Sequence, residues 1–246
     1  MKDCPVIVGI IGAMDVEVTL LQEHMDNCET VFVAGAPYCQ GIIAGVPCVV
    51  VRCGVGKVNA ALCTQVLVDH FEVTHIINTG AAGSLDVTLD IGDVVVALDC
   101  VQHDMDATKL GYAPGQVPGL PSAIFPVDGE LSDAVAAAAR AAVPEISIQR
   151  GRIATGDRFI CSDDDKHYIA HAFGACCCEM EGAAIAQACH ANGIPFSIIR
   201  AISDKADGSD AEAYPVFEEK AAHRSALIVE RFLADMPLHD SLGEYL

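Results

Sequence analysis

The sequence predicts an α/β fold in which helices cover both faces of a central β-sheet. Runs of β-branched apolar residues alternate with helix-like segments along most of the 246 residues. No low-complexity linker interrupts the alternation, and no internal repeat is present. We therefore expect a single domain over residues 1–246, with an irregular tail over about residues 235–246.

The first elements follow from local patterns. Residues 6–12 form an apolar run that predicts a buried strand, and residues 15–24 have helical spacing of their apolar positions. A β-branched run over residues 49–52 predicts another strand. It leads through a glycine turn at residues 54–57 into a helix over about residues 58–70.

The middle of the chain is less regular. Residues 75–78 predict a short strand that ends in a glycine-rich turn at residues 79–83, and residues 93–98 predict another strand. Residues 100–128 contain four prolines with glycines between them, so we expect this segment to be too irregular for core structure. Long loops of this kind are usually functional or interfacial.

The C-terminal part returns to the alternation of helices and strands. An alanine-rich helix is expected over about residues 130–142, and a strand-to-loop passage begins at Ile153. Helices over residues 181–192 and 214–233 flank a last strand over residues 196–202.

The charge balance excludes several classes of partner. The formal net charge is -20, from 34 acidic and 14 basic side chains. This balance disfavours nucleic acids, whose binding requires Lys and Arg to neutralise phosphates, and it disfavours an anionic membrane surface. No stretch approaches the ~20 apolar residues of a membrane span. We expect a small, neutral or cationic ligand, and neither a nucleic acid nor a membrane.

The 12 cysteines form no CxxC pair, which argues against a zinc ribbon or a thioredoxin motif. The consecutive Cys176, Cys177 and Cys178 are too close to pair with one another without strain. We interpret the cysteines as reduced thiols that act as small core residues, and we expect no metal. The N-terminal apolar run lacks a signal-peptide cleavage site, so we expect a cytoplasmic protein.

Carboxylates stand where predicted strands end, which is the edge at which such sheets bind ligands. Glu17 lies in the first turn of a helix, and Asp204 follows the last strand. Glu179 and Glu181 open a helix among small and apolar residues, where burial is costly unless a ligand satisfies them. Structural alternatives are a surface carboxylate at a helix start for Glu17 and a helix N-cap for Asp204.

Short motifs occur in order along the chain. They are residues 10–14 with Glu17 (IIGAM…E), 54–58 (GVGKV), 77–83 (INTGAAG), 103–104 (HD), 111–112 (GY), 115–119 (GQVPG), 156–160 (GDRFI), 179–181 (EME) and 200–204 (RAISD). Their order and spacing resemble the nucleoside phosphorylase/hydrolase superfamily, and within it the bacterial 5'-methylthioadenosine/S-adenosylhomocysteine nucleosidases. The resemblance covers about residues 6–232 and implies a mixed central sheet and no cofactor.

The resemblance implies hydrolysis of the N-glycosidic bond of 5'-methylthioadenosine, S-adenosylhomocysteine and 5'-deoxyadenosine, with release of adenine through an oxocarbenium-like transition state. This activity belongs to methionine salvage and nucleoside catabolism. Asp204 corresponds to the general acid for N7 of the base, with Ser203 as its hydrogen-bond partner. Glu17 corresponds to the residue that activates water, and Arg200 organises the charges.

The same resemblance assigns the substrate contacts. Glu181 would accept hydrogen bonds from the ribose hydroxyls, and Met180 would pack against the sugar. Phe159 would stack on adenine, and the backbone of Ile160 would contact its edge. The other residues implied in substrate binding are Met14, Val55, Ala81, Ala82, Gly83, Glu179 and Tyr214. A homodimer is implied, in which a partner's loop walls the pocket for the 5' substituent through Leu110, Tyr112 and Pro118.

Departures from the family leave the preferred 5' substituent open. Ala81 replaces a frequent serine and so removes a hydroxyl, while Leu110 and Tyr214 stand where phenylalanines are common. A hydrolase of aminodeoxyfutalosine shares the motifs and remains an alternative. A purine nucleoside phosphorylase is disfavoured, because Glu17 would repel phosphate and residues 78–84 contain no basic residue. A purine-binding module without activity would be expected to lack one of the carboxylates.

Overall fold

The computed structural model describes residues 5–207 and 214–236, although it leaves the side chains of residues 214–216 and 218 undescribed. The strands are β1 (Val8–Gly12), β2 (Asp26–Val33), β3 (Ala36–Ile43), β4 (Val46–Arg52), β5 (His75–Ser84), β6 (Val94–Gln102), β7 (Ile124–Pro126), β8 (Ile148–Thr155), β9 (Ala175–Glu179) and β10 (Phe196–Asp204). The helices are α1 (Asp15–Glu23), α2 (Lys57–Phe71), the short 3-10 helix η1 (Thr108–Leu110), α3 (Gly129–Ala142), α4 (Asp163–Phe173), α5 (Gly182–Asn192) and α6 (Tyr214–Asp235).

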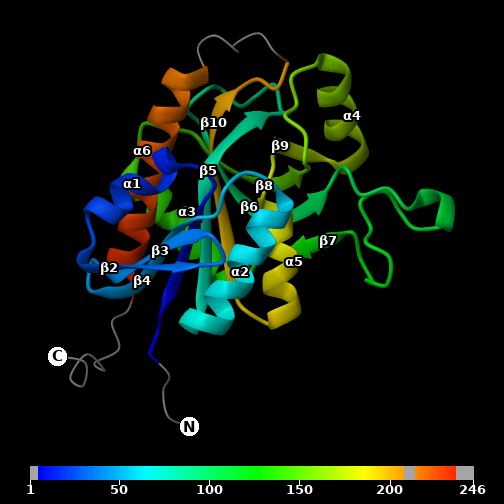
Figure 1. The fold of residues 1–246 in the computed structure, drawn as a ribbon. Coiled ribbons are helices and arrows are strands. Elements are labelled where there is room, and N and C mark those ends of the chain that lie inside the picture. Colours follow the sequence, from blue (N-terminus) through cyan, green and yellow to red (C-terminus); the bar gives the residue numbers. More distant parts are fainter. Residues whose placement is uncertain (1–4, 208–213, 237–246) are drawn as a thin grey trace.

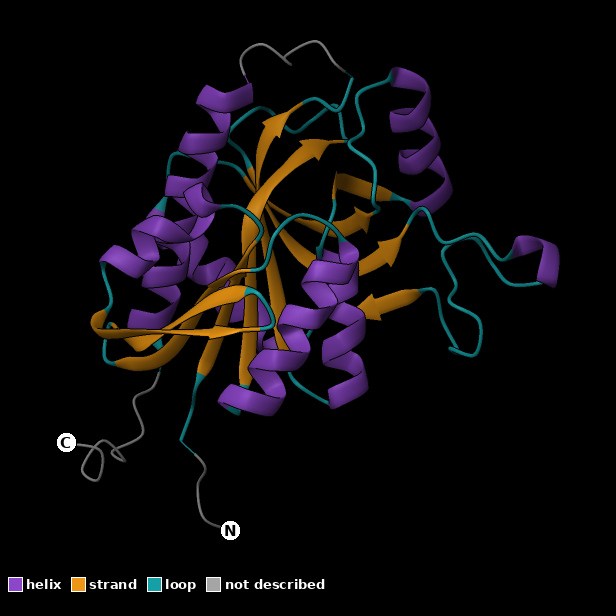
Figure 2. Cartoon of the chain, viewed as in Figure 1, coloured by secondary structure: helices purple, strands orange, loops and turns teal. Residues whose placement is uncertain are grey.

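All of these strands belong to one sheet of mixed direction, as predicted (Figures 1 and 2). Its order is β10-β6-β8-β9-β5-β1-β4-β3-β2, with β7 beside β6. Strand β10 also pairs with β5, so that β5, β10, β6, β8 and β9 form a closed ring of strands. Strands β1, β5 and β10 run parallel, and their carboxyl ends therefore meet at one edge.

Helices cover both faces of this sheet (Figure 1), with α1, α3 and α6 on one face and α2 and α5 on the other. The period-two alternation of strand side chains explains how one strand serves both faces. On β1, Val8 and Ile10 are buried against the first group of helices, and Ile11 against the second. Each such side chain stabilises the fold by roughly 1.5–3 kcal/mol through burial.

The prediction of free thiols is confirmed for the eleven cysteines in the described ranges, all of which are unpaired. Most are buried and take part in the core, including the run Cys176, Cys177 and Cys178 in β9. The prediction of burial is wrong for Cys28 and Cys161, which are exposed.

Strand β5 corrects the predicted glycine-rich turn at residues 79–83. The strand continues through these residues to Ser84, because β10 pairs with it in parallel as far as Gly83. The small side chains of this stretch reflect close approach of neighbouring groups rather than a change of chain direction.

The prediction that residues 100–128 are irregular is wrong at both ends of this segment. Cys100 and Val101 belong to β6 and are fully buried, and residues 124–126 form β7 beside them. The intervening chain, with η1, projects from the body of the molecule (Figure 1). We call residues 104–122 the arm.

Several elements have weaker sequence signals and were not predicted. Strand β2 is mostly exposed, so its apolar residues do not alternate clearly. Helix α4 begins after Ser162, whose hydroxyl accepts from the Asp165 amide at 3.3 Å, and ends at Gly174 with φ of 63°. A serine before the helix and a glycine after it are typical capping residues, so the sequence did contain a signal for this helix. Among the described residues, no helix is long and apolar enough to cross a membrane.

Candidate active site

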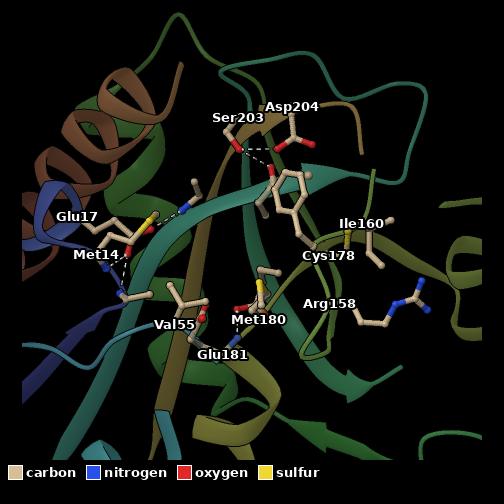
Figure 3. A pocket seen from close by; sticks show the side chains of 16 residues that line it. Met14, Glu17, Val55, Arg158, Ile160, Cys178, Met180, Glu181, Ser203 and Asp204 are labelled. Carbon is tan, nitrogen blue, oxygen red and sulfur yellow. Dashed lines mark hydrogen bonds between the residues drawn. The ribbon is translucent and has the colours of Figure 1, made fainter. Parts of the chain in front are cut away.

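A cavity of about 260 Å³ lies where β1, β5, β9 and β10 end or bend (Figure 3). Glu17, Glu181 and Asp204 approach it from different sides in that view. The residues that line it are Ala13, Met14, Glu17, Val55, Ala81, Ala82, Gly83, Arg158, Phe159, Ile160, Cys178, Glu179, Met180, Glu181, Ser203 and Asp204.

All but two of the residues predicted as catalytic or substrate-binding line this cavity. Arg200 lies behind its wall, and Tyr214 begins α6 with a side chain outside the described part of the structure. Ala13, Arg158 and Cys178 line the cavity without having been predicted. Ala13 and Arg158 lie within motifs named in the sequence analysis, and Cys178 directly precedes one. Their position in or beside these motifs could have identified them as lining residues.

The residues predicted to come from a partner subunit lie on the arm and do not line the cavity of their own chain. Leu110 is 77% exposed, while Pro118 is exposed and Tyr112 is partly buried. Their place on a projecting segment is compatible with contact to a second molecule.

Glu17 is held at the start of α1 by backbone amides. Its Oε2 accepts from Ala13 at 2.6 Å and Met14 at 3.0 Å, and its Oε1 accepts from Ala81 at 3.1 Å. Burial raises the pKa of Glu17 above its ordinary value, although the charge of Arg200 and these amides partly offset the rise. The carboxyl group is therefore both fixed in place and more basic than a surface glutamate.

Two glycines of β5 allow the carboxylates to approach. A Cβ atom at Gly80 would lie 2.5 Å from Oε1 of Glu17, and one at Gly83 would lie 2.8 Å from Oδ1 of Asp204. A larger residue at either position would displace a carboxylate, which explains the glycines at residues 80 and 83.

Asp204 ends β10 and is held from both sides. The hydroxyl of Ser203 donates to its Oδ2 at 2.9 Å, and the amide of Ala206 donates to its Oδ1 at 2.8 Å. The Ser203 hydroxyl also lies 3.3 Å from the carbonyl of Ala82. The carboxyl group is therefore oriented at the cavity wall before any ligand is present.

Glu179 forms a buried ion pair with Arg200, so a protein cation satisfies it rather than the ligand that the sequence suggested. The guanidinium donates to Oε2 of Glu179 at 2.5 Å and also bonds Asn78. Oε1 of Glu179 accepts from Thr155, and Oε2 accepts from the Gly182 amide at 2.7 Å. Burial disfavours the charge of Arg200, but Glu179 outweighs this effect and raises the pKa of Arg200. Glu179 is thus committed to protein donors.

Glu181, two residues later, has a different environment. Its Oε1 accepts from the Gly56 amide at 2.7 Å, and in the described ranges no side chain donates to it. Burial and the neighbouring Glu179 raise the pKa of Glu181 to about 8. It is the carboxyl group with acceptor capacity left for hydroxyl donors of a ligand.

The arrangement offers carboxyl groups for proton transfer and hydrogen bonding, next to an apolar rim. Within residues 5–207 and 214–236, no group of three or more His, Cys, Asp or Glu side chains is arranged to hold a metal ion. Two carboxyl groups on different walls of one cavity can act on opposite sides of a bound molecule.

Comparison with known proteins identifies the family. The model of the phosphorylase superfamily matches residues 7–234. A 5'-methylthioadenosine/S-adenosylhomocysteine nucleosidase of Geobacillus kaustophilus is 43% identical over 229 residues, which are 93% of this chain and 97% of that protein.

Solved structures support the same family assignment. The 5'-methylthioadenosine/S-adenosylhomocysteine nucleosidase from Neisseria meningitidis, in complex with methylthio-immucillin-A, has a TM-score of 0.90 and 41% identity, over 94% of this chain and 99% of that chain. The futalosine hydrolase of Helicobacter pylori has a TM-score of 0.88 and 31% identity, over 94% of this chain and 98% of that chain. This chain belongs to the phosphorylase superfamily and, within it, to the N-glycosyl hydrolases of the 5'-methylthioadenosine/S-adenosylhomocysteine nucleosidase family.

Proposed function

We propose that the protein hydrolyses the N-glycosidic bond of 5'-methylthioadenosine, S-adenosylhomocysteine and 5'-deoxyadenosine, releasing adenine and the 5-substituted ribose. The observation that supports this most strongly is the placement of Glu17, Glu181 and Asp204 around one cavity. The names of the relatives support the first two substrates.

Asp204 is the proposed general acid. Departure of adenine requires a proton at N7 as electrons flow into the base, so an oriented carboxyl group beside the purine lowers the barrier. The Ser203 hydroxyl and the Ala206 amide fix its orientation. Phe159 stacks on the base in this proposal, and the Ile160 backbone contacts its edge.

Glu17 is the proposed base that orients the attacking water. Burial raises its pKa, which favours accepting a proton from water as the C–O bond forms. The three amides that bind its oxygens limit its motion, and Arg200 balances the charge behind it. Ala81 supplies only a backbone amide here, so the water lacks the serine hydroxyl frequent in the family.

Glu181 is proposed to bind the ribose diol, because its carboxylate retains acceptor capacity. Met180 packs against the sugar, and Glu179 holds the start of α5 rather than the ligand. Met14, Val55 and Tyr214 would surround the 5' substituent.

We also propose that the protein acts as a cytoplasmic homodimer. The exposed Leu110 on the arm, with Tyr112 and Pro118, would close the 5' pocket of a second copy. The reduced state of the described cysteines fits a reducing compartment.

A phosphorylase is disfavoured by the charges at the cavity. A phosphate nucleophile needs accessible cations, but Arg200 is buried and bonded to Glu179 and Asn78. In the described part of the chain, Arg158 is the one cationic side chain that lines the cavity, and it pairs with Asp165 at 2.9 Å. Glu17 would repel phosphate at the sugar side.

The futalosine hydrolase of Helicobacter pylori supports one alternative, in which the 5' substituent is that of aminodeoxyfutalosine. Adenine release from 5'-methylthioadenosine, S-adenosylhomocysteine and aminodeoxyfutalosine, compared by kcat/KM, tests the proposal. We expect the two sulfur-containing nucleosides to be preferred. A strong preference for aminodeoxyfutalosine would establish the alternative, and no release from any of them would refute both.

A further inference from the structure

Three recognised motifs without a catalytic role converge beside the cavity. They contribute Lys57 at the start of α2, Asp104 after β6, and Asp157 after β8. Lys57 Nζ donates to Oδ1 of Asp104 at 2.6 Å, and the Asp157 amide donates to Oδ2 of Asp104 at 2.8 Å. The Lys57 amide donates to Oδ1 of Asp157 at 2.8 Å, which closes a ring of three hydrogen bonds. We call this the Lys57–Asp104–Asp157 ring.

The ring joins two walls of the cavity. On one side, the Gly56 amide, adjacent to that of Lys57, donates to Glu181 at 2.7 Å, and Val55 lines the cavity. On the other side, Asp157 directly precedes Arg158, Phe159 and Ile160, which also line it. The turn at Lys57 and the loop after Asp157 can therefore shift only together while the ring is intact.

The surroundings fix the ring further. Lys57 Nζ also donates to Gln102 at 3.1 Å, and Gln102 donates to Gln187 of α5 at 2.6 Å. A Cβ atom at Gly56, whose φ is 100°, would lie 3.1 Å from Oδ1 of Asp157. A Cβ atom at Gly156 would overlap the buried imidazole of His103. The close packing leaves little room for either loop to move independently.

Charge also favours the closed ring. Burial raises the pKa of Asp104, but the Lys57 ammonium and the Asp157 amide outweigh this effect and hold it below its ordinary value. The Lys57 and Asp104 side chains are only 18% and 21% exposed, so their hydrogen bond is partly shielded from water. Charge-assisted hydrogen bonds of this kind are stronger than neutral ones.

We propose that Asp104 and Lys57 are positioning residues that set the distance between the ribose-binding and adenine-binding walls. This inference rests on the proposed function, because it assigns those walls to the two halves of the nucleoside. Neither residue lines the cavity. Because the ring holds walls that bind the substrate and does not itself line the cavity, we expect it to affect ground-state and transition-state binding alike, which changes KM rather than kcat.

The test uses steady-state adenine release from 5'-methylthioadenosine by the full chain and by Asp104→Asn, Lys57→Met and the double variant. We expect each single variant to raise KM about tenfold, with kcat within about threefold of wild type. The double variant should raise KM no more than the worse single one, because both changes break the same ring. The inhibition constant of free adenine, which contacts one wall, should rise less than KM.

The matched control is Asp99→Asn. Asp99 pairs with Arg152 at 2.5 Å, with side chains 20% and 30% exposed, but it lies in β6 away from the cavity. Its KM should equal that of wild type even if its thermal midpoint falls, since KM does not depend on the folded fraction. Equal KM values for Asp104→Asn and Asp99→Asn, or additive effects in the double variant, would overturn the inference. No turnover by wild type would instead refute the proposed function.

Discussion

The floor and the rim of the cavity are built differently. The floor consists of Glu17, Glu179 and Asp204, with Arg200 behind it, and all four residues are buried and hydrogen-bonded to other protein groups. The rim consists of Val55 and Phe159, which are 48% and 57% exposed. The difference indicates that the groups for chemistry are preorganised within the chain, whereas the apolar rim is open to solvent, where the proposed ligand and partner would cover it.

Changing the proposed acid should give the largest effect. Asp204→Asn keeps the shape of the floor but removes the acidic proton, so we expect kcat to fall about 10³-fold. Inhibitor binding should stay within about tenfold, because an asparagine can still accept from the Ala206 amide. Stopped assays of adenine release and inhibitor titration measure the two quantities. Wild-type kcat in this variant would assign the acid elsewhere.

The two adjacent carboxylates should differ in their effect on stability. Glu179→Gln leaves the buried Arg200 without its counter-charge, so we expect a loss of about 3 kcal/mol in the free energy of unfolding. Glu181→Gln removes a carboxylate that burial already disfavours, so stability at pH 8 should be equal or higher. Urea denaturation measures both. Similar losses of unfolding free energy in the two variants would contradict the different environments assigned to Glu179 and Glu181.

Glu181 should also link stability to pH. Its pKa in the folded state, about 8, lies above its ordinary value of 4.5. The folded state therefore holds the proton more tightly between these values, and this contribution to stability is lost as the pH rises through 8. Wild type should lose stability relative to Glu181→Gln between pH 5.5 and pH 8.5. A constant difference over that range would contradict the raised pKa.

The same group predicts proton release on binding. A ribose diol donates to the ionised carboxylate, so binding of a nucleoside inhibitor below about pH 8 should release a proton from Glu181. Calorimetry at pH 6.5 in buffers of different ionisation enthalpy would measure it. If the Glu181→Gln variant released as many protons on binding as wild type, the proton would come from another group.

At the rim, effects should be small and confined to binding. Phe159→Leu reduces stacking on the base, for which we expect a rise in KM of about tenfold or less and little change in kcat. Phe32→Leu is a matched control, because Phe32 is 76% exposed on β2, far along the sheet from the cavity. A large fall in kcat for Phe159→Leu would give this residue a role in the chemical step.

The sequence predicted much of the fold because several elements have strong local signals. Helix α3 lies within one residue of its predicted start, β1 lies in its predicted apolar run, and β10 begins where predicted but extends beyond residue 202 to Asp204. The length of β5 could not be predicted, since residues 79–83 look like a turn and are extended because β10 pairs with them and β9 pairs with the end of the strand. These pairings join distant parts of the chain.

The site was predicted through motif order rather than through geometry. Local spacing placed Glu17 and Asp204 at strand ends, but it gave no sign that Arg200 neutralises Glu179. The contrast between Glu179 and Glu181 arises from long-range contacts with β10 and the Gly56 turn. The convergence of Lys57, Asp104 and Asp157 was equally invisible, because the three residues lie far apart in the sequence.

The most direct test of the account is adenine release from 5'-methylthioadenosine by the wild-type chain, with and without inorganic phosphate, combined with identification of the sugar product. The buried Arg200 and the carboxylate of Glu17 predict that phosphate neither accelerates release nor enters the product. The expected sugar is free 5-methylthioribose. Phosphate-dependent turnover that yields a sugar 1-phosphate would contradict the assignment of the floor to hydrolysis.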